Sequence, residues 1–76
     1  MPTTPVKPYD VLTQSLNSVV LVGLKDGHII RGRLAGFDLH VNLVLEDAEE
    51  IQGGEVKRRY GRMMIRGDSV LFVSPG

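Results

Sequence analysis

Two short segments of the chain carry side chains suited to holding a flat, hydrogen-bonding ligand such as a nucleobase. The first runs from Asp38 to Asn42 and contains His40, and the second is Arg66-Gly67-Asp68. His40 and Arg66 present planar groups, and the unstacked bases of single-stranded RNA are recognised by stacking on such groups. If the two segments converge in the fold, a pyrimidine fits between the two planar side chains.

Asn42 is the candidate for reading the edge of that base. Its carbonyl can accept from uracil N3–H while its amide donates to O4, and cytosine presents the opposite pattern. Selectivity requires that the amide cannot flip, and we expect Asp68 to hold it by accepting its other N–H. We expect Asp38 to stabilise its own loop, and Gly67 to let the backbone approach the ligand closely and offer it an N–H.

The residue types in the chain give little support for catalysis or metal binding. The chain has no cysteine, which excludes a thiolate nucleophile and a Cys-based zinc site. Its serines lack an evident partner arrangement of histidine and carboxylate, and no phosphate-binding glycine loop occurs. The acids between Glu46 and Glu50 alternate across an expected strand, so they cannot all converge on one ion. We therefore expect no enzyme activity, no cofactor and no metal.

Length and charge narrow the class of protein further. The 76 residues fall below the usual size of a domain, which predicts one domain at most. Nine Lys and Arg balance nine Asp and Glu, which argues against a basic domain held on nucleic acid by phosphate attraction alone. No apolar run approaches the roughly 18 residues that span a bilayer, and no signal-peptide pattern occurs. We expect a cytoplasmic protein.

The order of the expected elements is one helix followed by strands. Residues 1–7 read as a flexible lead-in, and residues 8–76 form the single domain. Pro8 suits the first turn of a short helix that ends at Asn17-Ser18, with Leu12 and Leu16 as its apolar face. β-branched runs and alternating polarity then predict strands over 19–24, 28–37, 41–51, 56–65 and 69–73.

Glycines within these strands predict a bent sheet. Asp26-Gly27 is a strong hairpin turn signal, while Gly32 and Gly36 mark places where the second strand can bend sharply. The pattern favours a small antiparallel barrel of SH3-like or OB-like type. The fifth strand is apolar on both faces, and pairing it with the fourth strand of an identical neighbour would close a ring. The most core-like residues of the fourth strand are Tyr60, Met63 and Ile65.

The two segments described first resemble the paired motifs of the Sm and Sm-like (Lsm) family. The first motif is matched from Val20 to Asp47, the second from Met64 to Val70, and the resemblance covers roughly residues 8 to 75. Val41 departs from the pattern, since methionine is common there, but it still fits a core-facing strand position. The segment 44–50 is similar to archaeal members in particular. The first motif is carried by Leu24, Gly27, Ile30, Gly32, Leu34, Phe37, Asp38, Asn42, Leu43 and Leu45.

This resemblance implies both an architecture and a function. The fold would be mainly β, an N-terminal helix followed by a strongly bent five-stranded open barrel, assembled into a homo-oligomeric ring that is usually a heptamer in archaea. The ring would bind uridine-rich single-stranded RNA at its pore, as an RNA chaperone or ribonucleoprotein scaffold in RNA processing. A ring repeats one site, so consecutive nucleotides gain from effective concentration. The implied RNA-binding residues are His40, Asn42, Arg66, Gly67, Asp68 and Asp38.

Other interpretations stay open from the sequence. The same ring could be a structural or protein-interaction scaffold, and a monomeric SH3-like adaptor is a third possibility. The basic run Lys57-Arg58-Arg59 is most simply exposed charge on a hairpin, although it is also a candidate for a secondary RNA or partner contact. Lys7 and Tyr9 could meet RNA on one ring face. The cell-adhesion tripeptide spelled by residues 66–68 is discounted, because three residues often recur by chance.

Overall fold

The computed structural model describes residues 6–75, so residues 1–5 of the expected lead-in lie outside the described part. The predicted order of elements is confirmed, with boundaries that differ by a few residues. The helix is α1 (Pro8–Gln14), and a short 3-10 helix, η1 (Gly67–Ser69), joins the last two strands. The five strands are β1 (Val19–Leu24), β2 (Ile29–Phe37), β3 (Leu43–Gln52), β4 (Glu55–Ile65) and β5 (Val70–Pro75).

Helix α1 begins at Pro8 as predicted and ends earlier than expected. Leu12 is buried against the sheet, and the ring of Tyr9 meets that of Phe37 edge-on at 5.3 Å, which ties the helix to the end of β2. The prediction that Leu16 shares this apolar face is wrong. The helix has already ended at Gln14, so Leu16 lies in the turn that follows and is partly exposed.

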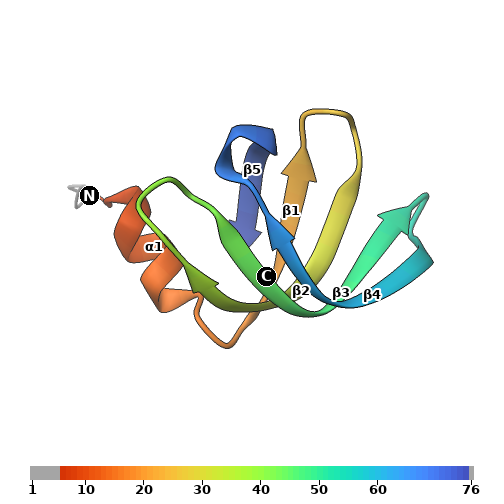
Figure 1. Cartoon of the computed structure of the whole chain (residues 1–76), viewed down its shortest axis with the longest axis horizontal. Helices are drawn as coiled ribbons and strands as arrows, with labels where there is room; N and C mark the ends of the chain where they lie inside the picture. Colours follow the sequence, from red (N-terminus) through yellow and green to blue (C-terminus); the bar gives the residue numbers. More distant parts are fainter. Residues whose placement is uncertain (1–5, 76) are drawn as a thin grey trace, which may run out of the picture.

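All five strands form one antiparallel sheet in the order β4-β3-β2-β1-β5. Figure 1 shows the sheet curling strongly, with α1 at one end and the β3–β4 hairpin reaching out at the other. The predicted fold class, an N-terminal helix and a bent five-stranded antiparallel sheet, is confirmed. Strands β4 and β5 are the two edges.

The bend follows from glycine positions and from a bulge that the sequence did not reveal. The pairing of β2 with β3 changes register at Gly32, as predicted, and again between Leu34 and Gly36, although a Cβ at Gly36 would meet nothing within 4 Å. A Cβ on Gly32 would lie 3.1 Å from Leu45 Cβ, so glycine allows the two strands to close. Asp47 has a φ of 54°, and the register of β3 against β4 shifts beside it. This bulge adds curvature to β3.

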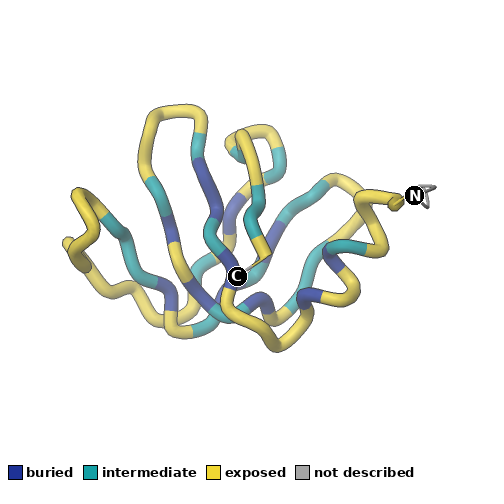
Figure 2. Tube along the Cα trace, turned by 180° about the vertical axis from the view of Figure 1, so that it is seen from behind, coloured by how far each residue is buried: buried dark blue, intermediate teal, exposed yellow. Residues whose placement is uncertain are grey.

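The core lies inside the curl of the sheet, the edge strand β4 is largely exposed, and the edge strand β5 is half exposed (Figure 2). The prediction for β4 is right for Ile65, which is buried, and wrong for Tyr60, which is 39% exposed. The hydroxyl of Tyr60 donates to Glu50 at 2.9 Å instead of entering the core. Within residues 6–75 no helix is long and apolar enough to cross a membrane. The buried side chains are Leu12, Val20, Val22, Ile30, Leu34, Leu43, Leu45, Ala48 and Ile65.

Candidate nucleic-acid interface

The turn between β2 and β3 is built around the carboxylate of Asp38. Its Oδ1 accepts from the backbone N–H groups of His40 at 2.9 Å and Asn42 at 3.1 Å, and its Oδ2 accepts from the side-chain amide of Asn42 at 3.0 Å. These donors, with the Asn42 side-chain amide first, lower the pKa of Asp38 below its ordinary value. Asp38 therefore stabilises its own loop, as predicted, and remains ionised at neutral pH.

Gly67 connects this turn to the segment that follows β4. The backbone N–H of Gly67 donates to Asn42 Oδ1 at 2.8 Å. A Cβ at Gly67 would overlap the carbonyl oxygen of His40 and would lie 3.1 Å from the carbonyl carbon of Val41. Only glycine permits this approach, and it brings the two segments singled out in the sequence together.

Two details of the predicted arrangement are wrong. The amide of Asn42 is held by Asp38 and not by Asp68, because Asp38 lies in the same tight turn while the carboxylate of Asp68 faces Arg66 at 3.6 Å. The N–H of Gly67 is not free for a ligand, since Asn42 already accepts it. These contacts nevertheless fix the orientation of the Asn42 side-chain amide. Oδ1 keeps its second lone pair and Nδ2 its second N–H, both available to a ligand.

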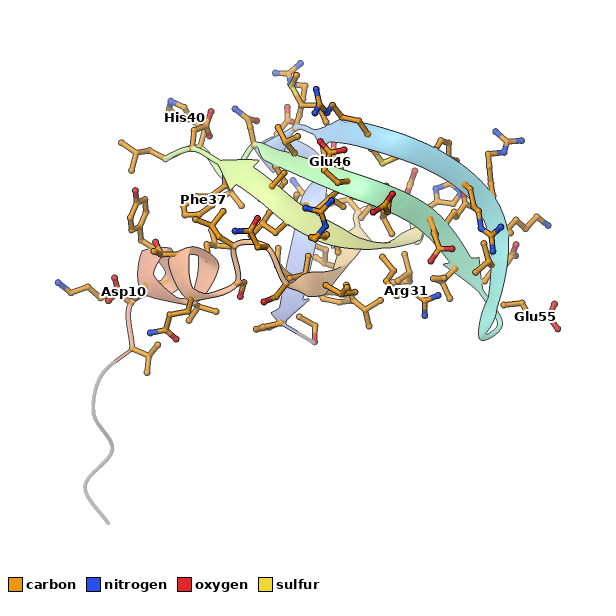
Figure 3. All side chains as sticks on the ribbon, turned by 90° about the horizontal axis from the view of Figure 1, so that it is seen from below. Asp10, Arg31, Phe37, His40, Glu46 and Glu55 are labelled. Carbon is orange, nitrogen blue, oxygen red and sulfur yellow. The ribbon has the colours of Figure 1, made fainter. Side chains whose placement is uncertain are left out.

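The predicted residues line one open pocket of about 560 Å³, formed by His40, Asn42, Arg66, Gly67 and Asp68. Asp38 supports its wall. Figure 3 places His40 near the α1 end of the sheet, far from Glu55 at the β3–β4 hairpin. The pocket combines two planar side chains with a fixed amide, which is the chemistry needed to stack a base and read its edge.

Val41 lies in the turn and not in a strand, contrary to the prediction. Its φ is 61°, and β3 begins only at Leu43. Its side chain is nevertheless partly buried and packs against the core, so the expected inward direction holds.

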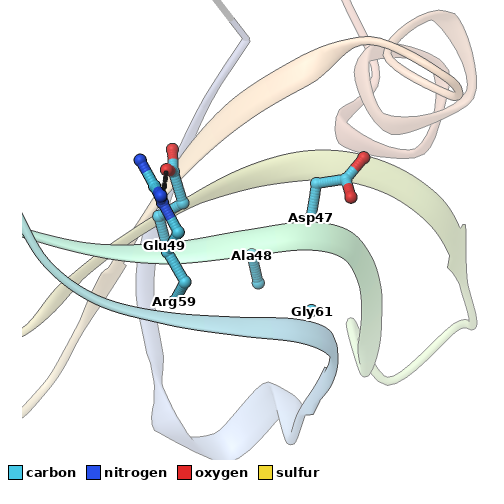
Figure 4. A pocket seen from close by; sticks show the side chains of 5 residues that line it. All are labelled: Asp47, Ala48, Glu49, Arg59 and Gly61. Carbon is cyan, nitrogen blue, oxygen red and sulfur yellow. Dashed lines mark hydrogen bonds and ion pairs between the residues drawn. The ribbon is translucent and has the colours of Figure 1, made fainter.

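A second pocket, of about 380 Å³, lies where β3 bulges beside β4 (Figure 4). Its charged residues already have ion-pair partners, either in the pocket or on the neighbouring strand β2. Glu49 accepts from Arg31 at 3.0 Å and from Arg59 at 3.2 Å, and these guanidinium groups lower the pKa of the Glu49 carboxyl. None of the residues predicted to bind a ligand lines this pocket, so we assign it no ligand.

Three of the four acids of β3, which the sequence predicts as a solvated face, pair with arginines of neighbouring strands, while Glu50 accepts from Tyr60. Besides Glu49, Glu46 accepts from Arg62, and Asp47 lies 3.6 Å from Arg33. The described residues contain no group of three or more His, Cys, Asp or Glu arranged to hold a metal ion. The basic residues that follow these acids across the Gly53-Gly54 turn are the sequence signal for such pairing.

Comparison with known proteins places the chain in a family. Residues 10–75 match the LSM domain model. A protein of Archaeoglobus fulgidus described as snRNP Sm-like is 61% identical over 71 residues, covering 93% of this chain and 92% of that protein.

Two solved structures are also similar to this chain. The Pyrococcus abyssi Sm protein in complex with a uridine heptamer has a TM-score of 0.89 at 56% identity, covering 93% of this chain and all of that one. The P. aerophilum SmAP1 heptamer has a TM-score of 0.87 at 49% identity, covering 96% of this chain and 97% of that one. Sequence and fold agree along nearly the whole length, and the chain belongs to the LSM domain family.

Proposed function

We propose that this protein forms a homo-oligomeric ring, a heptamer, that binds uridine-rich single-stranded RNA at its central pore. The observation that carries the proposal is the fixed amide of Asn42 in one pocket with the planar groups of His40 and Arg66. The similar Pyrococcus abyssi protein was solved with a uridine heptamer and the P. aerophilum protein as a heptamer, which supports the same ligand and assembly here.

The contacts of Asn42 explain a preference for uracil. Oδ1 is identified as the oxygen because it accepts the Gly67 N–H, and Nδ2 is identified as the nitrogen because it donates to the Asp38 carboxylate. Rotating the amide by 180° would set the Asp38 carboxylate against an oxygen and the Gly67 N–H against an N–H group. The amide therefore offers a pyrimidine one acceptor and one donor in a fixed order. That order matches N3–H and O4 of uracil and opposes N3 and N4–H of cytosine.

Stacking supplies binding that does not depend on which base is present. His40 and Arg66 come from separate loops, and we propose that a base lies between the imidazole and the guanidinium. Base stacking on such groups is worth about 1–3 kcal/mol per base. Gly67 and Asp68 shape the pocket wall, and Asp38 fixes the amide without touching the base. A ring repeats the pocket, so one RNA strand can occupy several copies at once.

The edges of the sheet support the ring. Among residues 6–75 no strand pairs with the outer side of β4 or β5, and these strands expose Met64 (73%) and Leu71 (67%). Exposed apolar edge strands favour pairing with another strand. Pairing β4 of one subunit with β5 of the next is head-to-tail, and such contacts close into a ring when the rotation between neighbours allows it.

The biological role that fits this chemistry is non-catalytic. We propose an RNA chaperone or ribonucleoprotein scaffold in RNA processing, acting in the cytoplasm, with residues 8–76 as the single domain. A structural ring whose main partner is another protein is the alternative. It predicts the same assembly without a dependence on base identity.

Fluorescence anisotropy with labelled oligo(U), oligo(C) and oligo(A) at fixed salt tests the proposal. Asn42→Ala removes the base reader, and we expect it to lower oligo(U) affinity at least tenfold, a loss of about 1.4 kcal/mol. Both proteins must first have the same mass by sedimentation. Equal affinity of the wild type for the three RNAs would reject base reading and favour the protein-scaffold alternative.

A further inference from the structure

Val41 has an unusual backbone conformation between the two most important residues of the pocket. Three non-glycine residues within 6–75 have positive φ, and the other two are Asn17 and Asp47, whose side chains tolerate this region. Val41 is β-branched and has a φ of 61°. A β-branched residue in this region is strained, and such strain persists only where the surroundings impose it.

The left-handed turn at Val41 brings Asn42 back beside Asp38. Four residues of extended strand span about 13 Å, too far for a side chain of Asp38 to reach Asn42. In the structure both the backbone N–H and the side-chain amide of Asn42 donate to that carboxylate, at 3.1 and 3.0 Å. The turn conformation is thus a condition for fixing the amide.

Three contacts impose this conformation on Val41. Its backbone N–H donates to the Asp38 carbonyl at 3.0 Å. Gly67 packs closely against its carbonyl, since a Cβ at Gly67 would lie 3.1 Å from the carbonyl carbon of Val41. Its side chain packs against the hydrophobic core, while His40 and Asn42 on either side line the pocket. Of these three contacts, only the packing of the isopropyl side chain connects the turn to the hydrophobic core.

We propose that Val41 is a positioning residue for base selectivity, because its side chain, seated in the core, holds the left-handed turn that aims His40 and Asn42 into the pocket. This inference rests on the proposed function and deepens it. It assigns part of the uracil preference to a side chain that does not touch the base.

Three substitutions separate the core anchor from the backbone strain. Val41→Ala removes the anchor and the β-branching but keeps the Cβ penalty of a positive φ, whereas Val41→Gly removes the anchor and all of the strain. Val41→Met restores an apolar, adaptable side chain without β-branching. We expect the Ala and Gly variants to lose roughly tenfold in oligo(U) affinity and in the U-to-C affinity ratio, and the Met variant to stay within about twofold of wild type. If strain alone mattered, the Gly variant would match or exceed wild type.

A second measurement does not depend on RNA. Hydrogen exchange of the Gly67 amide, followed by NMR, reports its bond to Asn42 Oδ1. We expect faster exchange in the Ala and Gly variants, protection in the Met variant, and unchanged exchange at Val20 and Val22 in β1. Wild-type exchange at Gly67 in the Gly variant would overturn the inference. The exchange experiment tests the role of Val41 even if the wild-type ring shows no preference for uridine. A lack of preference would reject only the proposed function.

If the Ala variant does not assemble, Val41→Thr provides the same test with an unchanged shape. The hydroxyl of threonine weakens the packing of this side chain against the hydrophobic core. We then expect a reduced U-to-C ratio and faster exchange at Gly67, and wild-type values of both would count against the anchor.

Discussion

The backbone N–H of Gly67 donates to Oδ1 of Asn42 at 2.8 Å, and this bond joins two loops that are 25 residues apart in the sequence. It occupies one of the two lone pairs of the Asn42 side-chain oxygen and brings η1 against the turn that carries His40. The pocket therefore depends on a contact between loops as well as on the groups that face the ligand.

Substitution of Gly67 by alanine should disrupt this contact. The new Cβ would overlap the His40 carbonyl, which is backbone and cannot move aside cheaply. We expect Gly67→Ala to lower the free energy of unfolding by about 2 kcal/mol and to abolish selective oligo(U) binding. Gly36→Ala is the matched control, because a Cβ at Gly36 meets nothing within 4 Å. Denaturant titration of both variants checks the prediction, and equal losses would contradict it.

Asp38 and Asp68 can be distinguished by the same type of substitution. Asp38→Asn places an amide where a carboxylate now accepts three N–H groups, so Asn42 loses its fixed orientation. We expect the preference for oligo(U) over oligo(C) to fall roughly tenfold. Asp68→Asn leaves those bonds intact and should retain the preference. Anisotropy titrations with both RNAs measure it, and a larger effect at Asp68 would show that the amide is held differently.

His28 should make the stability of the chain depend on pH near neutrality. Its Nδ1 lies 2.8 Å from the Asp26 carboxylate and its Nε2 3.8 Å from Glu50, and the hydrogen bond to Asp26 raises the pKa of His28 above its ordinary 6.5. The folded state thus favours protonated His28. The resulting stabilisation is complete below pH 6.5 and is lost as the pH rises through the higher folded pKa.

The melting temperature measured between pH 5 and pH 9 at constant salt checks this dependence. We expect His28→Gln to flatten the decline of the melting temperature above pH 6.5, and Asp26→Asn to shift that decline to lower pH. NMR titration of the His28 ring gives the pKa directly, and a value at or below 6.5 would disagree with the geometry.

The edge strand β5 should control assembly. Leu71 is 67% exposed on this edge. A lysine there places a charge where we propose that the neighbouring β4 pairs, and charged edge residues oppose such pairing. We expect Leu71→Lys to convert the ring to monomers or small oligomers in sedimentation velocity. Val19→Lys, at an exposed position of the interior strand β1, should leave the ring intact. A ring that survives Leu71→Lys would contradict the β4–β5 contact.

Local patterns in the sequence predict the elements well. β1 follows directly from its β-branched run, α1 begins at Pro8, and the register shift at Gly32 lies where a glycine interrupts β2. Residue types in the two loops, together with their resemblance to the Sm motifs, also predict the five residues that line the pocket. These features depend on residues that are close together in the sequence, so the local sequence pattern is enough to predict them.

Features that depend on exact distances could not be predicted. Either Asp38 or Asp68 could have held the Asn42 amide, and the geometry of one turn decides for Asp38. The bulge at Asp47 and the exposure of Tyr60 follow from how β3 and β4 shift past each other beside Gly61, which has a φ of 75°. A glycine inside a strand signals a bulge but does not give the size of the register shift.

The most direct test of base reading is to remove the uracil N3–H without removing the stacking surface. Anisotropy should compare oligo(U) with an oligonucleotide of the same length in which every uridine is N3-methyluridine, on the same wild-type ring and at the same salt. We predict a loss of at least tenfold in affinity, because Asn42 Oδ1 then faces a methyl group in place of a donor. Equal affinity for the two RNAs would contradict base reading by Asn42.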